Sequence, residues 1–341
     1  MNLAWLCILA CIMTWMLTGL LRRYAVAKNL IDIPNVRSSH HVATPRGGGV
    51  AIVVVFLLAL FFLYRIDLLS MPVLLAFAGA GTLVAITGFL DDHRHIPARW
   101  RLLAHFCGAA WGLYWLGGFP PMQVFGAVVS LGWLGHGLCL VYLVWLLNLY
   151  NFMDGIDGIA SIEAISVCLG GALLLIVPEY DFKAAVWPLL LLSAGVTGFL
   201  SWNFPPAKIF MGDAGSGFLG IMLGLFSIQA TWIAPQFFWS WLILLGVFIV
   251  DATLTLCRRF FQHEKVYEAH CSHAYQHAAR FYQAHKPVSL AVAGINLCWL
   301  LPVALGVGFG NLNGFWGLTI AYLPLVLLAA HFRAGIRNSQ S

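Results

Sequence analysis

Apolar stretches recur along nearly the whole 341-residue chain, from residue 2 to residue 331, and they constrain its fold more than any other feature. A helix needs about 20 apolar residues to cross the hydrocarbon core of a bilayer, and most of these stretches approach that length. Only 9% of the residues are charged, whereas soluble domains carry about 25%. The mean hydropathy is +0.87. The sequence therefore excludes an ordinary soluble domain and predicts an all-α polytopic membrane protein.

The apolar stretches predict eleven transmembrane helices. The fourth is short and the segment 118–130 is ambiguous, so counts of ten and twelve remain alternatives. The expected spans are 2–21, 47–64, 71–90, 102–117, 131–149, 159–177, 184–202, 215–233, 238–256, 289–309 and 314–331. An odd number of crossings places the two ends of the chain on opposite sides of the membrane.

The basic residues indicate which side faces the cytoplasm. Sixteen of the 18 Lys and Arg residues fall on the side of residue 22, which leaves Arg65 and Lys183 on the other side. Cytoplasmic loops carry an excess of Lys and Arg. We therefore expect the N-terminus outside the cytoplasm and the C-terminus inside it. The net charge of +5 is too small to indicate a nucleic-acid partner.

We predict a single integral-membrane domain over 1–341, without a separate soluble domain. Its cytoplasmic segments are expected at about 22–46, 91–101, 148–158, 203–214 and 257–288.

Carboxylates form three clusters at the cytoplasmic ends of apolar helices. They are Asp91 with Asp92, Asp154 with Asp157, and Asp213. Several acids on one membrane face repel one another unless a cation neutralises them, so the clusters indicate a shared divalent cation. The alternative for a single Asp is a solvated helix cap. Three clusters together favour the cation site.

The second cluster lies in NLYNFMDGIDGIA, residues 148–160. Asn148, Asn151, Asp154 and Asp157 recur every three residues, so successive members are neighbours where the backbone is helical. Two glycines interrupt that helix and let a ligand approach the main chain. Amide and carboxylate oxygens are hard ligands that suit Mg²⁺.

The third cluster lies in NFPPAKIFMGDAGSGFLG, residues 203–220. Its two prolines stop one helix, and the glycines around Asp213 begin the next. A glycine-rich helix start exposes N–H groups that favour phosphate, while Asp213 adds a ligand for a cation. A plain N-cap role for Asp213 is the alternative.

Basic residues and histidines in two further loops predict an anion site. The segment 31–49 places Arg46 directly before three glycines. His270, His273 and His277 have the spacing that aligns three residues on one face of a helix. A diphosphate held between His or Arg side chains and Mg²⁺ fits these loops better than a zinc site.

These motifs occur together and in order in one known family. D-x-P-x-x-R-x-x-H…TPRGGG, the GFLDD pair, N-x-x-N-F-x-D-G-x-D-G and MGDAGSGFLG resemble the polyprenyl-phosphate N-acetylhexosamine-1-phosphate transferase superfamily, whose members include the MraY and WecA enzymes. The resemblance covers about residues 32–280. The element around His270 and His273 is most similar to the WbpL-like branch, which starts O-antigen chains. Ser272 replaces one histidine of the family's H-x-H-H pattern, which argues against MraY itself.

The resemblance implies that undecaprenyl phosphate and a UDP-N-acetylated sugar react to give undecaprenyl-diphospho-sugar and UMP. It implies a multi-pass protein of the bacterial inner (cytoplasmic) membrane with an active site that faces the cytoplasm, so the N-terminus, expected outside the cytoplasm from the basic residues, is periplasmic. It also implies dependence on Mg²⁺, with Mn²⁺ as the alternative metal. The sugar stays open between GlcNAc and a 6-deoxy-N-acetylhexose such as FucNAc or QuiNAc. The expected partners are this lipid, the UDP-sugar and the bilayer, with a homodimer left open.

The family's motifs also imply residue roles. Asp213 and Asn151 are the expected Mg²⁺ ligands, and Asp91 is the expected base or orienting group for the lipid phosphate. The catalytic residues that the resemblance implies are Asp91, Asp92, Asp154, Asp157 and His270. The substrate-binding residues that it implies are Arg46, Asn148, Asn151, Asn203 and His273.

Two other functions remain open. A phospho-MurNAc-pentapeptide transferase of peptidoglycan synthesis is the alternative within the family. A proton- or ion-coupled transporter is the alternative outside it, and it would require ionisable residues near mid-span on several helices. Only Asp251 and Glu163 lie within the expected spans, both near a cytoplasmic end, and Glu163 is expected to be a paired structural residue.

Overall fold

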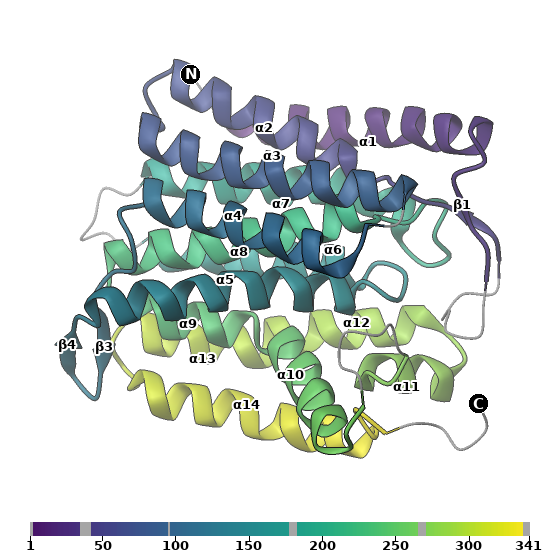
Figure 1. Ribbon diagram of the computed structural model, residues 1–341. Coiled ribbons are helices and arrows are strands. Elements are labelled where there is room, and N and C mark those ends of the chain that lie inside the picture. Colours follow the sequence, from purple (N-terminus) through teal and green to yellow (C-terminus); the bar gives the residue numbers. More distant parts are fainter. Residues whose placement is uncertain (1–2, 35–41, 95, 177–182, 265–270, 337–341) are drawn as a thin grey trace.

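The computed structural model describes residues 3–34, 42–94, 96–176, 183–264 and 271–336. This part of the chain is mostly helical and carries two short antiparallel strand pairs (Figure 1). Most of the helices run side by side along one direction, in a single bundle. The predicted helical membrane architecture is confirmed, and the two strand pairs are small additions to it.

The helices are α1 (Ala4–Ala27), α2 (Val50–Arg65), α3 (Met71–His93), α4 (Ala98–Trp115), α5 (Gly132–Met153), α6 (Ile159–Leu175), α7 (Lys183–Asn203), α8 (Asp213–Ile233), α9 (Phe237–Leu244), α10 (Gly246–Phe261), α11 (Ala274–Tyr282), α12 (His285–Ile295), α13 (Leu301–Gly308) and α14 (Gly314–His331). A π-helical turn, Asn296–Leu300, joins α12 to α13. Strand β1 (Ile31–Asp32) pairs with β2 (Thr44–Pro45), and β3 (Met122–Val124) pairs with β4 (Ala127–Val129).

Each of the eleven expected spans coincides with a helix or with consecutive helices. Within the described residues, seven helices are long and apolar enough to cross a membrane. An eighth span results if α9 and α10, which meet at 71°, count as one. Helices α2 and α6 are shorter apolar helices. The count of eleven and the orientation in the membrane stay predictions.

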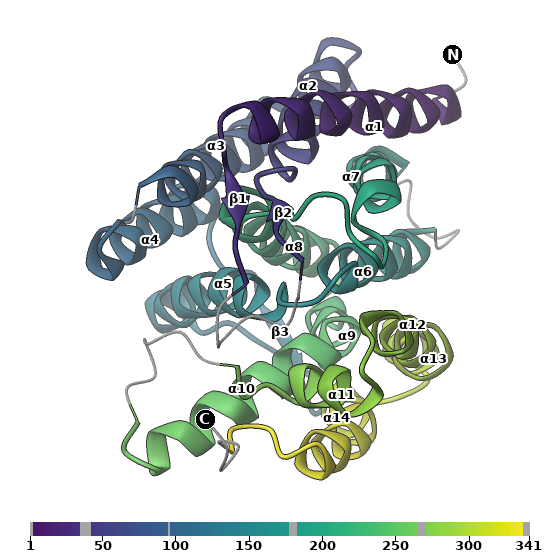
Figure 2. The same ribbon diagram turned by 90° about the vertical axis from the view of Figure 1, so that its right-hand side faces the viewer.

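Helix α8 lies at the centre of the bundle. It packs against α3 and α5 and also contacts α2, α6 and α9. Of its apolar window, 83% is buried, the largest share among the candidate spans. Glycine permits this close packing, since a Cβ on Gly220 would lie 2.7 Å from the Cα of Leu147. Because α8 begins at Asp213, the fold places this carboxylate in the middle of one end of the bundle, which we call the site end (Figure 2).

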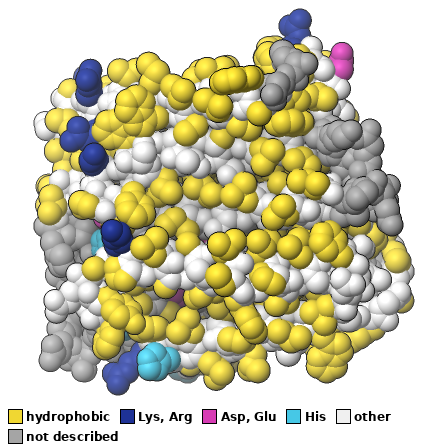
Figure 3. Space-filling model, turned by 180° about the vertical axis from the view of Figure 1, so that it is seen from behind, with side chains coloured by type: hydrophobic (Ala, Val, Ile, Leu, Met, Phe, Trp, Pro, Cys, Tyr) yellow, Lys and Arg dark blue, Asp and Glu magenta, His cyan; other side chains and the backbone are white. Residues whose placement is uncertain are grey.

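Charged side chains lie mainly near the two ends of the bundle, and an apolar surface separates them (Figure 3). Helices α1 and α14 both run toward the site end, so the described parts of the chain begin and finish at opposite ends of the bundle (Figure 1). The segment 118–130, ambiguous in the sequence, contains the β3–β4 hairpin and adds no span. This hairpin lies at the end opposite the site end.

Candidate active site

The site end brings together the carboxylates of the first and third clusters. Asp213 is the first residue of α8, and its side chain is 37% exposed. Arg101 of α4 lies between two acids: its Nη1 atom pairs with Asp91 and is 3.7 Å from Oδ2 of Asp213. Asp91 also accepts a hydrogen bond of 2.7 Å from the N–H of Ile96. Asp213 is therefore the more accessible carboxylate of the two.

Asp92 is buried against the backbone at the start of α8. Its Oδ2 atom lies 3.5 Å from the backbone nitrogen of Ala214. Its main-chain carbonyl accepts a hydrogen bond from the guanidinium of Arg46. A carboxylate is stabilised at a helix N-terminus by the helix dipole. Asp92 thus caps α8, and Arg46 fastens the loop before α2 to the end of α3.

The two glycine-rich motifs pack against each other. The N–H groups of Gly48 and Gly49 donate to the carbonyls of Phe210 and Met211, at 2.9 Å in each case. A Cβ on Gly49 would lie 2.5 Å from the Cα of Gly215, so the two backbones meet where neither carries a side chain. The glycines of both motifs therefore serve close packing of the main chain.

The start of α8 does not offer a phosphate the free N–H groups that we expected from its glycines. The N–H of Ala214 faces the Asp92 carboxylate, and the N–H groups of Gly215 and Ser216 donate to the carbonyl of Gly212. Gly212 has φ of 79°, in the left-handed region, and a Cβ there would lie 2.7 Å from Oδ2 of Asp92. The helix start is closed by its own chain, and this expectation is wrong.

The end of α5 places Asn151 beside Asp213. The Nδ2 atom of Asn151 donates to Oγ of Ser216, on the first turn of α8, at 3.1 Å, and the Asn151 side chain lies near enough to the Asp213 carboxylate to favour its charged form. The two residues expected to share a cation are therefore neighbours. Asn148, one turn earlier, donates to the Val144 carbonyl of its own helix at 2.7 Å.

Asp154 follows α5 directly and lies close to acids of all three clusters. Burial deprives its carboxyl group of water, and the charges of Asp213, Asp92 and Asp157 act in the same direction. Together they raise the pKa of Asp154 well above its ordinary value of 3.8. The three clusters thus form one electrostatic unit, in which a divalent cation would relieve the repulsion.

Asp157 connects the turn before α6 to two other segments. Its Oδ2 atom accepts a hydrogen bond of 3.0 Å from the N–H of Ala207. Its Oδ1 atom lies 3.2 Å from Nδ1 of His285, and its carbonyl accepts a hydrogen bond of 2.7 Å from Ser289. These contacts hold α12 and the segment before α8 around the site end.

Asn203 has a comparable position at the end of α7. Its Oδ1 atom accepts a hydrogen bond of 2.9 Å from the N–H of Gly158, and its Nδ2 atom donates to the carbonyl of Ile209 at 3.0 Å. Asn203 is buried, and both ends of its amide bond to main chain, so it holds the backbone around the site together.

His273 lies before α11 and not within it. It is the N-cap of this helix, it is 2% exposed, and its Nδ1 atom lies 3.4 Å from Oδ1 of Asp251. His277 lies inside α11, whereas His270 lies outside the described residues. The expected alignment of three histidines on one helical face is therefore wrong, because the helix begins only at Ala274.

Asp251 of α10 fixes where α11 begins. Its two carboxylate oxygens accept hydrogen bonds from the N–H groups of Ala274 and Tyr275, both of 2.9 Å. Tyr275 in turn donates its hydroxyl to the carbonyl of Phe152, also at 2.9 Å. Helix α11 is thus clamped between α10 and the end of α5, next to Asp154.

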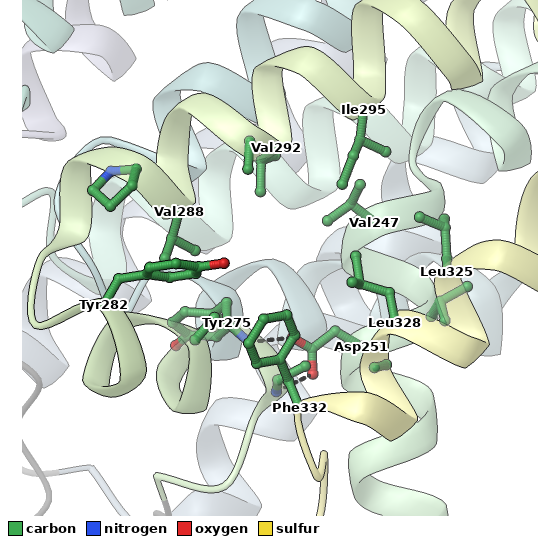
Figure 4. Close-up of a pocket in the computed structure, with 16 residues that line it drawn as sticks. Val247, Asp251, Tyr275, Tyr282, Val288, Val292, Ile295, Leu325, Leu328 and Phe332 are labelled. Carbon is green, nitrogen blue, oxygen red and sulfur yellow. Dashed lines mark hydrogen bonds between the residues drawn. The ribbon is translucent and has the colours of Figure 1, made fainter.

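An apolar pocket of about 490 Å³ lies beside α11 (Figure 4). Helices α10, α11, α12 and α14 line it, with side chains such as Val247, Val288 and Leu325. The hydroxyl of Tyr282 points into it, and the bonded carboxylate of Asp251 lies at its edge. The pocket offers an aliphatic surface close to the polar site.

The donor chemistry of the site end fits a magnesium ion. Among the described residues, no three His, Cys, Asp or Glu side chains form a metal-binding group on their own. Mg²⁺ does not require such a group, because it commonly binds one or two carboxylates and completes its shell with water and substrate phosphates. The accessible carboxylate of Asp213, with the Asn151 amide beside it, meets this requirement.

Two residues of the site received no role from the sequence. Arg101 joins Asp91 to Asp213, and Ser216 holds Asn151. Arg101 lies ten residues after Asp91, in the same segment predicted to be cytoplasmic, and this closeness in sequence could have indicated a role. Other basic residues lie in the same segment, however, and the positive-inside rule already explained their presence and that of Arg101.

The helical membrane bundle thus gathers acids, an arginine and amides at one end, a set of polar side chains that can bind a cation and an anionic group. Residues 74–231 match the family described as Glycosyl transferase family 4. The resemblance predicted from the motifs is thereby confirmed, and the chain is an enzyme of the phosphosugar transferase class. The similarity to the WbpL-like branch stays a prediction.

Three relatives show the extent of the similarity. A Bacillus subtilis (strain 168) protein, named a probable undecaprenyl-phosphate N-acetylglucosaminyl 1-phosphate transferase, is 27% identical over 282 residues, 81% of this chain and 77% of the relative. The Mycobacterium leprae decaprenyl-phosphate N-acetylglucosaminephosphotransferase is 27% identical over 65% of this chain and 59% of its own length. A Streptococcus pneumoniae (strain Taiwan19F-14) phospho-N-acetylmuramoyl-pentapeptide-transferase is 32% identical over 62% of this chain and 65% of its own length.

Proposed function

We propose that this protein transfers a sugar 1-phosphate from a UDP-N-acetylhexosamine, or its 6-deoxy form, to undecaprenyl phosphate, with release of UMP. The observation that carries the proposal is the meeting of Asp213 and Asn151 at the start of the central helix, beside Asp91 and Arg101. The names of the relatives, which include both undecaprenyl-phosphate and decaprenyl-phosphate transferases, support the same class of reaction.

The reaction requires positioning and charge neutralisation more than a strong base. An oxygen of the lipid phosphate attacks the phosphorus that carries the sugar, and the bond from that phosphorus to the UMP oxygen breaks. A phosphate monoester is already largely ionised near neutral pH, so no side chain has to remove a proton. Arg101, 34% exposed, is available to neutralise charge on the phosphate oxygens.

We assign Mg²⁺, with Mn²⁺ as the alternative, to Asp213 and Asn151. When bound there, the ion supplies Lewis-acid stabilisation of the diphosphate. The chain's own residues orient this site: Ser216 holds the Asn151 side chain, and Asp92 fixes the helix start from which Asp213 extends.

Direct attack is favoured over a covalent aspartyl-phosphate. The Asp91 side chain is 7% exposed, its Oδ1 accepts the Ile96 N–H and its Oδ2 pairs with Arg101, and these contacts make it a weaker and less accessible nucleophile. Asp91 therefore serves as an orienting group for Arg101 and the lipid phosphate. The isoprenoid chain of that lipid would find an aliphatic surface in the pocket between α10, α11, α12 and α14.

The biological role that we propose is the initiation of O-antigen synthesis at the cytoplasmic face of the inner membrane. The departure from the family's histidine pattern at Ser272 supports this role over peptidoglycan synthesis. The 32% identity to a phospho-N-acetylmuramoyl-pentapeptide-transferase keeps peptidoglycan synthesis as the second candidate. Release of UMP from a panel of UDP-sugars, including UDP-GlcNAc and UDP-MurNAc-pentapeptide, distinguishes the two.

The decisive variant is Asp213→Asn in the purified protein. We expect turnover of UDP-sugar with undecaprenyl phosphate to fall about 100- to 1,000-fold, as after loss of one electrostatic contact in other active sites. The melting temperature should be retained. Asp67→Asn, exposed at the opposite end of the bundle, is the control and should keep full turnover. Near-normal activity and metal response in Asp213→Asn would reduce Asp213 to a helix cap and contradict the proposed function.

A further inference from the structure

Helix α12 and the turn that continues it present a row of polar side chains to α6 and to the turn before it. His285, Ser289 and Asn296 are spaced by four and seven residues, which places them along one helical face. The first two contact Asp157, through its Oδ1 atom and its main-chain carbonyl. The third contacts Glu163, on the second turn of α6. We call these three residues the α12 polar row.

The contact between Glu163 and Asn296 is buried and incomplete. The Nδ2 atom of Asn296 donates to Oε2 of Glu163 at 2.6 Å, and the two residues are 4% and 0% exposed, respectively. The remaining oxygens, Oδ1 of Asn296 and Oε1 of Glu163, are also buried and have no hydrogen-bond partner among the described residues. Both are acceptors, so the pair lacks one donor. Buried polar atoms in native proteins are rarely left unsatisfied.

A proton on Glu163 would supply the missing donor. An ionised carboxylate has only acceptors, whereas a protonated one carries an O–H that can bond the amide oxygen. An isolated charge in an apolar interior is also strongly disfavoured, and among the described residues no Lys, Arg or His forms an ion pair with Glu163. One proton therefore removes two unsatisfied acceptors and one uncompensated charge.

We propose that Glu163 carries a proton and forms a neutral acid–amide pair with Asn296, and that this pair positions α12 so that His285 and Ser289 hold Asp157. The π-helical turn begins at Asn296, so the pair anchors α12 at the point where its helical pitch changes. Glu163 is a positioning residue in this arrangement. Its effect on catalysis rests on the proposed function, whereas its protonation does not.

Infrared spectroscopy of protein with isotope-labelled glutamate tests the protonation directly. The chain has four glutamates, and those in water are ionised at neutral pH. We expect the carbonyl stretch of one protonated glutamic acid at pH 6 and pH 7 in the wild type, and its loss in Glu163→Gln. Absence of such a band, or its persistence in Glu163→Gln, would overturn the proposal.

Stability and kinetics test the positioning. Glutamine keeps a donor and an acceptor, so Glu163→Gln should melt and turn over as the wild type does, while Glu163→Leu should lower both the melting temperature and kcat. Ser166→Ala is the matched control, because the Ser166 hydroxyl donates to the Ile162 carbonyl of its own helix. In Glu163→Leu/His285→Ala, the loss of kcat should be smaller than the product of the two single losses.

Equal damage in Glu163→Gln and Glu163→Leu, or fully multiplicative losses in the double variant, would contradict the positioning role. If Glu163→Leu does not fold, the infrared band and the behaviour of Glu163→Gln still decide the question. Neither the infrared band nor the melting temperature requires a substrate, so the results of these two tests do not depend on the proposed reaction.

Discussion

Gly88 of α3 lies directly against the peptide group of Asp213. A Cβ on Gly88 would come within 2.5 Å of the Asp213 carbonyl oxygen and of the Ala214 nitrogen. The missing side chain lets α3 approach the start of α8, so that Asp91 and Asp92, one turn further along α3, reach the same site. The position of the accessible carboxylate therefore depends on a glycine that has no chemical role.

We expect Gly88→Ala to destabilise the protein by about 1–3 kcal/mol, the usual cost of overpacking a filled interior. Turnover should fall further than the folded fraction does, because the clash displaces the backbone that carries Asp213. Thermal melting in detergent and UMP release measure the two effects. Gly137→Ala on α5 is the control, since a Cβ there meets nothing within 4 Å. Identical melting and turnover in the two variants would show that α3 and α8 accommodate the added methyl group without loss of stability or activity.

The raised pKa of Asp154 predicts that the stability of the folded protein depends on pH. Burial, and then the neighbouring acids, raise its pKa in the folded protein, whereas the unfolded chain has the ordinary value of 3.8. As pH rises above that value, the unfolded chain loses the proton and the folded protein retains it, so the Asp154 contribution to stability falls. We expect Asp154→Asn to melt higher than the wild type at neutral pH and to lose this part of the pH slope.

Melting curves from pH 4 to pH 8 without divalent cations, for the wild type and Asp154→Asn, provide the measurement. Addition of Mg²⁺ should stabilise the wild type more than the variant if the ion relieves the repulsion around Asp154. Asp67→Asn, remote from the site, should leave the pH slope unchanged. Parallel curves for all three proteins would show that Asp154 is not electrostatically coupled to the other acids.

The helices could be predicted from the sequence because apolar length is a local property of the chain. Each expected span coincides with a helix or with consecutive helices. The meeting of Asp213 with Asn151 was predictable for a related reason: both lie beside an end of an apolar helix, on the same predicted face of the membrane. Antiparallel packing of α5 and α8 then brings these two helix ends together.

The contacts between motifs could not be predicted in this way. Periodicity predicted a helix through His273, but the Asp251 carboxylate binds the N–H groups of Ala274 and Tyr275 and so fixes a later start. No partner could be predicted for the glycines before α2, but Gly49 packs on Gly215. Such contacts join residues far apart in the chain, and no single stretch of sequence records them.

The orientation of the bundle in the membrane is testable because exposed residues lie at both ends. Asp67, between α2 and α3, and Arg99, near the start of α4, are exposed at opposite ends of α3. In a variant without the eight native cysteines, we expect Asp67→Cys to react with an impermeant maleimide on intact cells. Arg99→Cys should react only after lysis. The reverse pattern would place the site end outside and would contradict a cytoplasmic active site.

Substitutions of His273 distinguish a phosphate-binding role of this side chain from a structural role. It is buried, it lies 3.4 Å from Asp251, and it forms a capping box with Gln276 at the start of α11. We therefore expect His273→Ala to lower stability by about 1 kcal/mol, as other lost helix caps do. Asparagine is a favoured N-cap residue, so His273→Asn should recover part of that stability and of the activity. Melting temperature, kcat and KM for UDP-sugar are measured for both variants.

A donor to the diphosphate would behave differently. Its bond strengthens as charge builds on the departing UMP oxygen, so its removal lowers kcat while the fold stays intact. Asparagine could not replace a protonated imidazole in that role, and the two variants would lose the same kcat at an unchanged melting temperature. That outcome would return His273 to the substrate-binding residues and would require the start of α11 to open when substrate binds, since the side chain is only 2% exposed in the closed arrangement.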